Sequence, residues 1–363
     1  MKNNILHVFL SATLLLSCIA ASATEDENAA TRDCLEIYNR AVAFFEESQY
    51  EQSVQTYKLA RECWLESADG ELNPDSSICL NNIGYVYANA GDFDTALQYY
   101  TSAIEEYTEQ FGENHQQIVN SLENIAHLYQ SEGMYNQALP YYKKALAIEE
   151  ELYGSDSKQA VGTHNTLGHL LRELGQYDRA LEHYDKVLVF VSGEYGESHE
   201  YTANTLSSIA RVYSDVQQYD KALDLYARAL DIIETTSGPE SESAASVYLG
   251  MGSVAGDLGE HGKALQAFES ALQIYRATRE GPDPDVASAL NNIAYIHQKQ
   301  GNYESALEYF HKALDIDLQL HGESHPITST RYNNIGYIHD MLGAYDKAVA
   351  FYEKSLSIRI AAY

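Results

Sequence analysis

The sequence predicts an all-α fold, a right-handed superhelical solenoid of about eight helix-turn-helix repeats. Two observations carry this prediction. A pattern with a period of 42 residues runs through most of the 363-residue chain, and apolar residues inside each period follow helical spacing. Periods of roughly 20 to 50 residues are typical of solenoids, in which each repeat buries its apolar face against its neighbours.

Four positions define the repeat. A glycine recurs, followed five residues later by an alanine and four residues after that by an aromatic residue. A small residue, alternately Gly and Ala, precedes the glycine by seven residues. The glycine positions are Gly91, Gly133, Gly175, Gly259, Gly301 and Gly343, with Gln217 in the remaining place. The alanines are Ala96, Ala138, Ala180, Ala222, Ala264, Ala306 and Ala348. The small residues are Gly84, Ala126, Gly168, Ala210, Gly252, Ala294 and Gly336.

Apolar residues on both sides of the glycine predict two helices per repeat. Leu80, Ile83 and Tyr87 lie at i, i+3 and i+7, and Phe93 and Leu97 continue the spacing after the turn. The glycine fits the left-handed residue that ends the first helix, here called helix A. Small residues allow helix A and the following helix B to approach closely.

The chain is predicted to divide into four parts. Residues 1–23 have the layout of a secretory signal peptide, with an apolar run followed by Ala21-Ser22-Ala23. A retained signal-anchor, and a lipoprotein anchored through Cys18, are the alternatives. Residues 24–33 form an acidic leader, residues 34–76 a degenerate first repeat, and residues 77–363 seven repeats, the last truncated after helix B. The signal predicts a secreted or periplasmic (envelope) location.

Three cysteines remain after the signal, namely Cys34, Cys63 and Cys79. None of the spacings is C-x-x-C, so neither a zinc knuckle nor a redox dithiol is predicted. A Cys34–Cys63 or a Cys63–Cys79 disulfide and three buried thiols all stay open at this point.

The repeat positions resemble the tetratricopeptide repeat, lengthened from its usual form to 42 residues. The connectors, such as 112–115, 196–199 and 322–326, resemble those of kinesin light chains, and the likeness covers about residues 34–363. The N-terminal coiled coil of kinesin light chains has no counterpart. The resemblance implies a concave groove, lined by helix A, that binds protein or peptide. It also implies that the asparagines of helix A hold the backbone of an extended ligand.

The predicted groove is rich in Asn, Tyr and His and has few charges. Its residues are Asn82, Tyr85, Asn124, His127, Asn165, Arg172, Arg211, Asn292, Tyr295, Lys299, Asn334 and Tyr337. Amides donate and accept hydrogen bonds, so they suit peptide groups. The alternative is that the asparagines only cap and bridge neighbouring helices. With three basic residues at most, a site that clamps a terminal carboxylate is not expected.

Charge limits the partners. With 53 acidic and 23 basic residues the formal net charge is −30, which disfavours nucleic acid and anionic membranes and favours a neutral or basic protein partner. Catalytic and phosphate-binding motifs are not found, and the connector histidines His115, His199 and His325 lie too far apart to share a metal. A non-catalytic protein with neither cofactor nor metal is therefore predicted.

The predicted function is an exported scaffold that binds protein or peptide. One alternative is a cytoplasmic cargo adaptor similar to kinesin light chains. The other is a structural protein that stacks end to end, with homo-oligomers formed through the apolar C-terminal end around residues 358–363.

Overall fold

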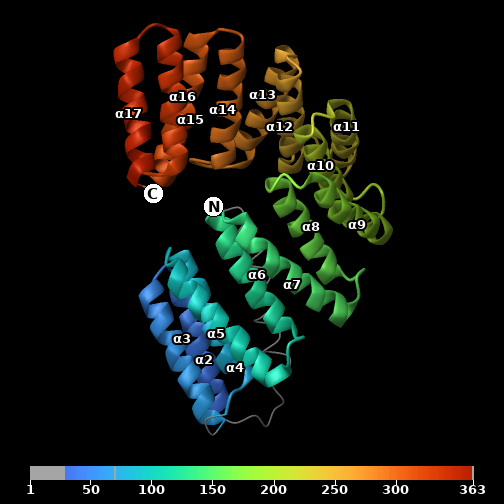
Figure 1. Cartoon of the computed structure of the whole chain (residues 1–363), viewed down its shortest axis with the longest axis vertical. Helices are drawn as coiled ribbons and strands as arrows, with labels where there is room; N and C mark the ends of the chain where they lie inside the picture. The colour runs from blue at the N-terminus through green and yellow to red at the C-terminus, as the bar shows by residue number, and fades with distance from the viewer. Residues whose placement is uncertain (1–28, 69–70, 362–363) are drawn as a thin grey trace. The chain divides into compact units, whose positions relative to one another are not determined.

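The computed structural model describes residues 29–68 and 71–361. The predicted signal peptide and most of the acidic leader lie outside the described residues. Sixteen α-helices, and no β-strand, make up the described chain (Figure 1). Contacts divide the chain into an N-terminal unit ending at Thr163 and a C-terminal unit beginning at His164. Each unit is described by itself.

The helices alternate between A and B as predicted. The A helices are α2 (Ala29–Glu46), α4 (Pro74–Asn89), α6 (Gln116–Ser131), α8 (Lys158–Glu173), α10 (Glu200–Asp215), α12 (Glu242–Asp257), α14 (Pro284–Lys299) and α16 (Pro326–Met341). The B helices are α3 (Tyr50–Ser67), α5 (Phe93–Phe111), α7 (Tyr135–Tyr153), α9 (Tyr177–Tyr195), α11 (Tyr219–Thr236), α13 (His261–Thr278), α15 (Tyr303–His321) and α17 (Tyr345–Ala361). From α4 onwards the A helices begin at intervals of 42 residues, while α2 begins five residues before the predicted boundary at residue 34.

Neighbouring helices within each unit pack side by side. Within a repeat, pairs such as α4 with α5 and α16 with α17 are in contact, and B helices such as α3 and α15 also pack on the following A helix. Each helix pair thus buries its apolar faces against the next pair. The all-α repeat-solenoid class is confirmed, and the handedness of the superhelix stays a prediction.

The residue that ends helix A is left-handed in each clear case. Gly91 and Gly343 have φ values of 81° and 72°, and the other turn glycines are similar. Gln217 takes the same conformation with φ 59°, as does Ser48 in the degenerate first repeat. The backbone conformation is therefore a property of the repeat, and glycine is the residue that adopts it without strain.

The small residue of helix A accommodates the aromatic ring of helix B. A Cβ atom added to Gly84 would lie 2.9 Å from the Tyr100 ring, and one added to Gly252 would lie 2.7 Å from the Phe268 ring. Both rings are almost fully buried. The close approach predicted between helices A and B is thus an approach of backbone to ring.

A disulfide joins the two helices of the first repeat. Cys34 of α2 bonds to Cys63 of α3, with a Cα–Cα distance of 5.5 Å. This settles the alternatives that the sequence left open, because Cys79 is a free and buried thiol. Tyr38, Tyr57 and Trp64 surround the bond in one apolar cluster.

Among the helices described, none combines the length and the apolar character needed to cross a membrane.

Candidate peptide-binding surface

In the N-terminal unit the predicted asparagines bridge helices. Asn82 donates a hydrogen bond from Nδ2 to the Tyr38 hydroxyl at 2.7 Å, and Asn124 donates to Oδ1 of Asn81 at 3.2 Å. The Asn81 oxygen also accepts from the Ser121 hydroxyl at 3.0 Å. These contacts join the A helices of consecutive repeats. The bridging role weighed as the alternative is therefore present.

The aromatic positions of this unit differ in exposure. Tyr85 of α4 is half-buried, with its ring 5.2 Å from the ring of Phe45. His127 occupies the same repeat position on α6 and is exposed. Burial raises the pKa of the Tyr85 hydroxyl, so it stays protonated and able to donate at neutral pH.

In the C-terminal unit the predicted residues of α14 and α16 form an Asn–Tyr surface, defined as Asn292, Tyr295, Lys299, Asn334 and Tyr337. Tyr295 and Tyr337 are 43% and 41% exposed. The Lys299 ammonium lies 5.0 Å from the centre of the Tyr295 ring, a cation–π arrangement. The two asparagines are half-buried, one helical turn before the tyrosines.

An amide bridge also joins the two helices of this surface. Asn334 donates from Nδ2 to Oδ1 of Asn291 at 3.3 Å. An asparagine side chain has two N–H donors and an oxygen with two lone pairs. One bridge therefore leaves capacity for a ligand, and bridging does not exclude binding. Whether a ligand uses these amides stays a prediction.

The three remaining residues lie on α8 and α10. Asn165 and Arg211 are exposed, and Arg211 lies near Tyr226, whose pKa is raised by burial and lowered in part by the Arg211 charge. Arg172 bonds from Nε to Oδ2 of Asp215 at 2.6 Å and lies 3.0 Å from Glu173. Burial alone would lower the pKa of Arg172, but these carboxylates raise it overall. The charge of Arg172 is thus neutralised within the protein.

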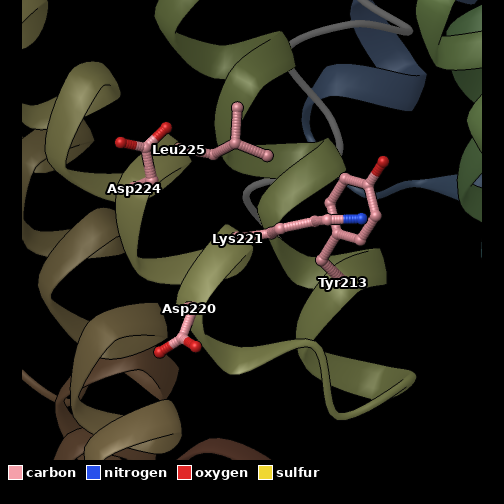
Figure 2. A pocket seen from close by; sticks show the side chains of 5 residues that line it. All are labelled: Tyr213, Asp220, Lys221, Asp224 and Leu225. Carbon is pink, nitrogen blue, oxygen red and sulfur yellow. The ribbon is translucent and has the colours of Figure 1, made fainter.

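A shallow hollow lies beside Tyr213, as Figure 2 shows. Its volume is about 390 Å³, and its lining residues are Tyr213, Asp220, Lys221, Asp224 and Leu225. Other repeats stack two rings at the positions of Tyr213 and Leu225, for example Tyr87 on Tyr99 with centres 5.6 Å apart. The smaller Leu225 leaves the space, and the Lys221 ammonium lies 5.1 Å from the Tyr213 ring. The substitution of an aromatic by leucine was the signal in the sequence.

The connector histidines have a structural role that the sequence analysis did not assign. His115, His199 and His325 each accept a hydrogen bond at Nδ1 from the backbone N–H two residues later, at 3.3, 3.1 and 3.2 Å. They therefore cap α6, α10 and α16. Each ring also packs on a ring at the end of the preceding B helix, such as Phe111 on His115. Burial lowers the pKa of His115 and His325, which favours the neutral, accepting imidazole.

Two buried polar clusters were not predicted either. In the N-terminal unit Thr163 lies 2.6 Å from a Glu149 oxygen and 3.2 Å from a Glu123 oxygen. Burial, and then the Glu149 charge, raise the pKa of Glu123 to about 7. The residues are visible in the sequence, but no repeat position marks them.

In the C-terminal unit, His164 and His183 approach to 2.8 Å between their Nδ1 atoms. The Lys186 ammonium lies 3.3 Å from Nε2 of His164. A lysine ammonium can only donate, so Nε2 of His164 accepts and Nδ1 carries the proton toward His183. Across the described residues no group of three or more His, Cys, Asp or Glu side chains is arranged to hold a metal.

Solved structures resemble the chain in fold. The apo form of RapI shares 18% identity, covers 79% of this chain and 98% of its own, and has a TM-score of 0.60. A tetratricopeptide repeat protein from Parabacteroides merdae shares 20%, covers 78% and 93%, and has a TM-score of 0.57. A putative kinesin light chain from Podosopora anserina, with nearly identical TPR-like repeats, shares 17%, covers 58% and 100%, and has a TM-score of 0.49.

No curated protein matches the chain. The family described as "Tetratricopeptide repeat" matches residues 33–107, 76–151, 117–188, 159–235, 201–277 and 285–361, and a second profile of that description matches 249–319. This repeat scaffold indicates a protein–protein interaction module. With matches over most of its length, the chain belongs to the tetratricopeptide repeat family, in the long kinesin-light-chain-like form with a 42-residue period.

Proposed function

We propose that the protein is an exported, non-catalytic scaffold that binds an extended segment of a partner protein on the A-helix surface. The observation that carries the proposal is the Asn–Tyr surface of α14 and α16. There, two tyrosines at the same repeat position are each more than 40% exposed, beside half-buried amides. The predicted location is outside the cytoplasm, after removal of residues 1–23.

The chemistry of this surface matches an extended peptide. Asn292 and Asn334 supply amide donors and acceptors, which complement the alternating N–H and C=O groups of a peptide backbone. Tyr295 and Tyr337 offer apolar area with a polar tip, so they contact side chains at low entropic cost. An unstructured segment that binds here gains backbone hydrogen bonds and ring contacts together.

The charge distribution favours a neutral or basic segment. The chain has a net charge of −30, and Arg172, one of the few cations among the predicted residues, is neutralised by Asp215 and Glu173. Lys299 sits over a tyrosine ring beside the surface. A strongly acidic ligand would therefore meet long-range repulsion with little local compensation.

A selected peptide tests the binding surface. Peptides would be selected on the immobilised wild-type protein from a displayed library of random 12-residue sequences, and their Kd measured by fluorescence polarisation. The Tyr295→Ala/Tyr337→Ala variant should bind about ten-fold or more weakly. The matched control is Tyr153→Ala, at a tyrosine that is 45% exposed on α7; it should bind like the wild type. Unchanged affinity of the double variant would place the site elsewhere.

Export is tested separately. Fractionation of the source cells and N-terminal sequencing should find a chain that begins at Thr24 outside the cytoplasm. A full-length chain in the cytosol would instead favour the cargo-adaptor alternative.

A further inference from the structure

Helix α17, the red helix at the C-terminal end in Figure 1, carries an exposed apolar stripe. The α17 stripe is defined as Tyr345, Val349, Leu356 and Ile360, which are 67%, 53%, 57% and 69% exposed. Their spacing of four, seven and four residues places them on one face of the helix. Contiguous apolar residues of this size on a water-exposed helix face mark an interaction surface.

The repeat shows what normally covers these positions. One period earlier, on α15, the matching residues are Tyr303, Leu307, Leu314 and Leu318. These pack in one apolar cluster with Tyr332, Ile335 and Ile338 of the next A helix, α16. The α17 stripe therefore has the shape and chemistry that receive another helix.

The first repeat of a second copy does not fit this surface. On α4, Cys79 and Ile83 are fully buried and belong to the apolar cluster that includes residues of α3. The matching residues of α2 are Glu36 and Arg40, and both are exposed. Placing them on the α17 stripe would bury two charges against apolar side chains, which is costly. Head-to-tail stacking, the arrangement needed for an open filament, is thus disfavoured.

The stripe is complementary to itself. Tyr345 and Ile360, and likewise Val349 and Leu356, lie at equal distances along the sequence from the midpoint between residues 352 and 353. In an antiparallel pair of α17 helices, Val349 would face the partner's Leu356, and Tyr345 the partner's Ile360. We propose that two copies of the chain form a closed, two-fold symmetric dimer through α17. A two-fold contact uses the same patch on both subunits and does not propagate.

The charges of α17 allow this pairing. Asp346 and Glu353 are outnumbered by Lys347, Lys354 and Arg359, so the helix is net positive in a chain of net charge −30. Glu353 lies closest to the proposed axis, where its partner copy adds a like charge. Together with the net charge, this repulsion predicts that the dimer becomes tighter as salt screens it.

Sedimentation of the full chain tests the dimer. Between about 1 and 100 µM the mass should rise from 40.5 kDa to twice that value and then stop. Val349→Glu/Leu356→Glu should remain monomeric, whereas Val189→Glu, at an apolar residue 73% exposed on α9, should dimerise like the wild type. A monomer at all concentrations overturns the proposal, including one in which residues 1–28 of the same chain cover the stripe. Growth beyond a dimer overturns it too.

The antiparallel register has its own test. Val349→Cys and Leu356→Cys chains, mixed and mildly oxidised, should cross-link to each other far more than either does to itself. Seven helical residues span about 10 Å, so two copies of position 349 lie too far apart for a disulfide. Preferential 349–349 cross-linking would contradict the register. A peptide-binding failure of the Tyr295/Tyr337 variant would leave the dimer unaffected, so the two proposals fail separately.

Discussion

Fully buried alanines hold the repeats together at the scale of single residues. Ala222 on α11 has no exposed surface and lies in the same apolar cluster as Tyr226 and Ala210. Any added atoms must displace a neighbouring helix, since protein interiors are close-packed.

We expect Ala222→Leu to lower the free energy of unfolding by about 1–3 kcal/mol through overpacking. Ala227→Leu, on the exposed side of the same helix, is the control and should stay within about 0.5 kcal/mol of the wild type. Chemical denaturation followed by circular dichroism measures both. Equal stability of the Ala222→Leu variant would show that α11 is packed differently.

The buried carboxyl group of Glu123 should make stability depend on pH. Its pKa is raised from 4.5 to about 7 by burial and then by Glu149. The protonated form is the one the fold favours, so its stabilising contribution is complete below pH 4.5 and is lost as pH rises through about 7. The Glu123→Gln variant, which cannot ionise, should lack this loss.

The difference in unfolding free energy between Glu123→Gln and the wild type should therefore change by on the order of 1–3 kcal/mol between pH 4.5 and 8. Taking the difference removes the opposing effect of the connector histidines, which lose their capping capacity as pH falls. Parallel pH profiles for the two proteins would show that Glu123 is not buried as described.

At the scale of helices, the disulfide compensates for an irregular first repeat. Ser53 stands where the other repeats have alanine, and its hydroxyl donates to the Ala41 carbonyl at 2.8 Å. The Cys34–Cys63 bond ties α2 to α3 beside this contact. A terminal repeat has a neighbour on one side only, so a covalent link adds what a second interface would supply.

Cys34→Ala/Cys63→Ala should destabilise the protein by about 2–4 kcal/mol. A reducing agent should destabilise the wild type by a similar amount and leave the double variant unchanged. A reductant effect that persists in the double variant would point to a different pairing.

Sequence patterns predicted the helices but not every contact between them. The turn glycines and apolar spacing defined the helix pairs, because backbone conformation and burial at these positions recur in each copy. The cysteine pairing could not be chosen, because it depends on which side chains of α2, α3 and α4 meet. Histidine caps were missed because Ser, Thr, Asp and Asn are the usual capping residues. Asn82, Asn124 and Asn334 proved to be bridges, which spacing alone cannot tell from ligand contacts.

At the scale of the whole molecule, different surfaces have different tasks. The net charge of −30 opposes nucleic acid and anionic membranes and keeps copies apart in general. Against this background the Asn–Tyr surface and the α17 stripe stand out, because their exposed side chains include aromatic and aliphatic groups. We assign partner binding to the first and self-association to the second.

Tyrosine footprinting tests the central claim, peptide binding at the Asn–Tyr surface, most directly. Hydroxyl-radical labelling would be compared with and without saturating selected peptide, at a protein concentration where the oligomeric state is constant. Tyr295 and Tyr337 should become protected, while Tyr153 and Tyr345, which are 45% and 67% exposed, should label as before. Protection of other residues, with Tyr295 and Tyr337 still labelled as in the free protein, would contradict the account.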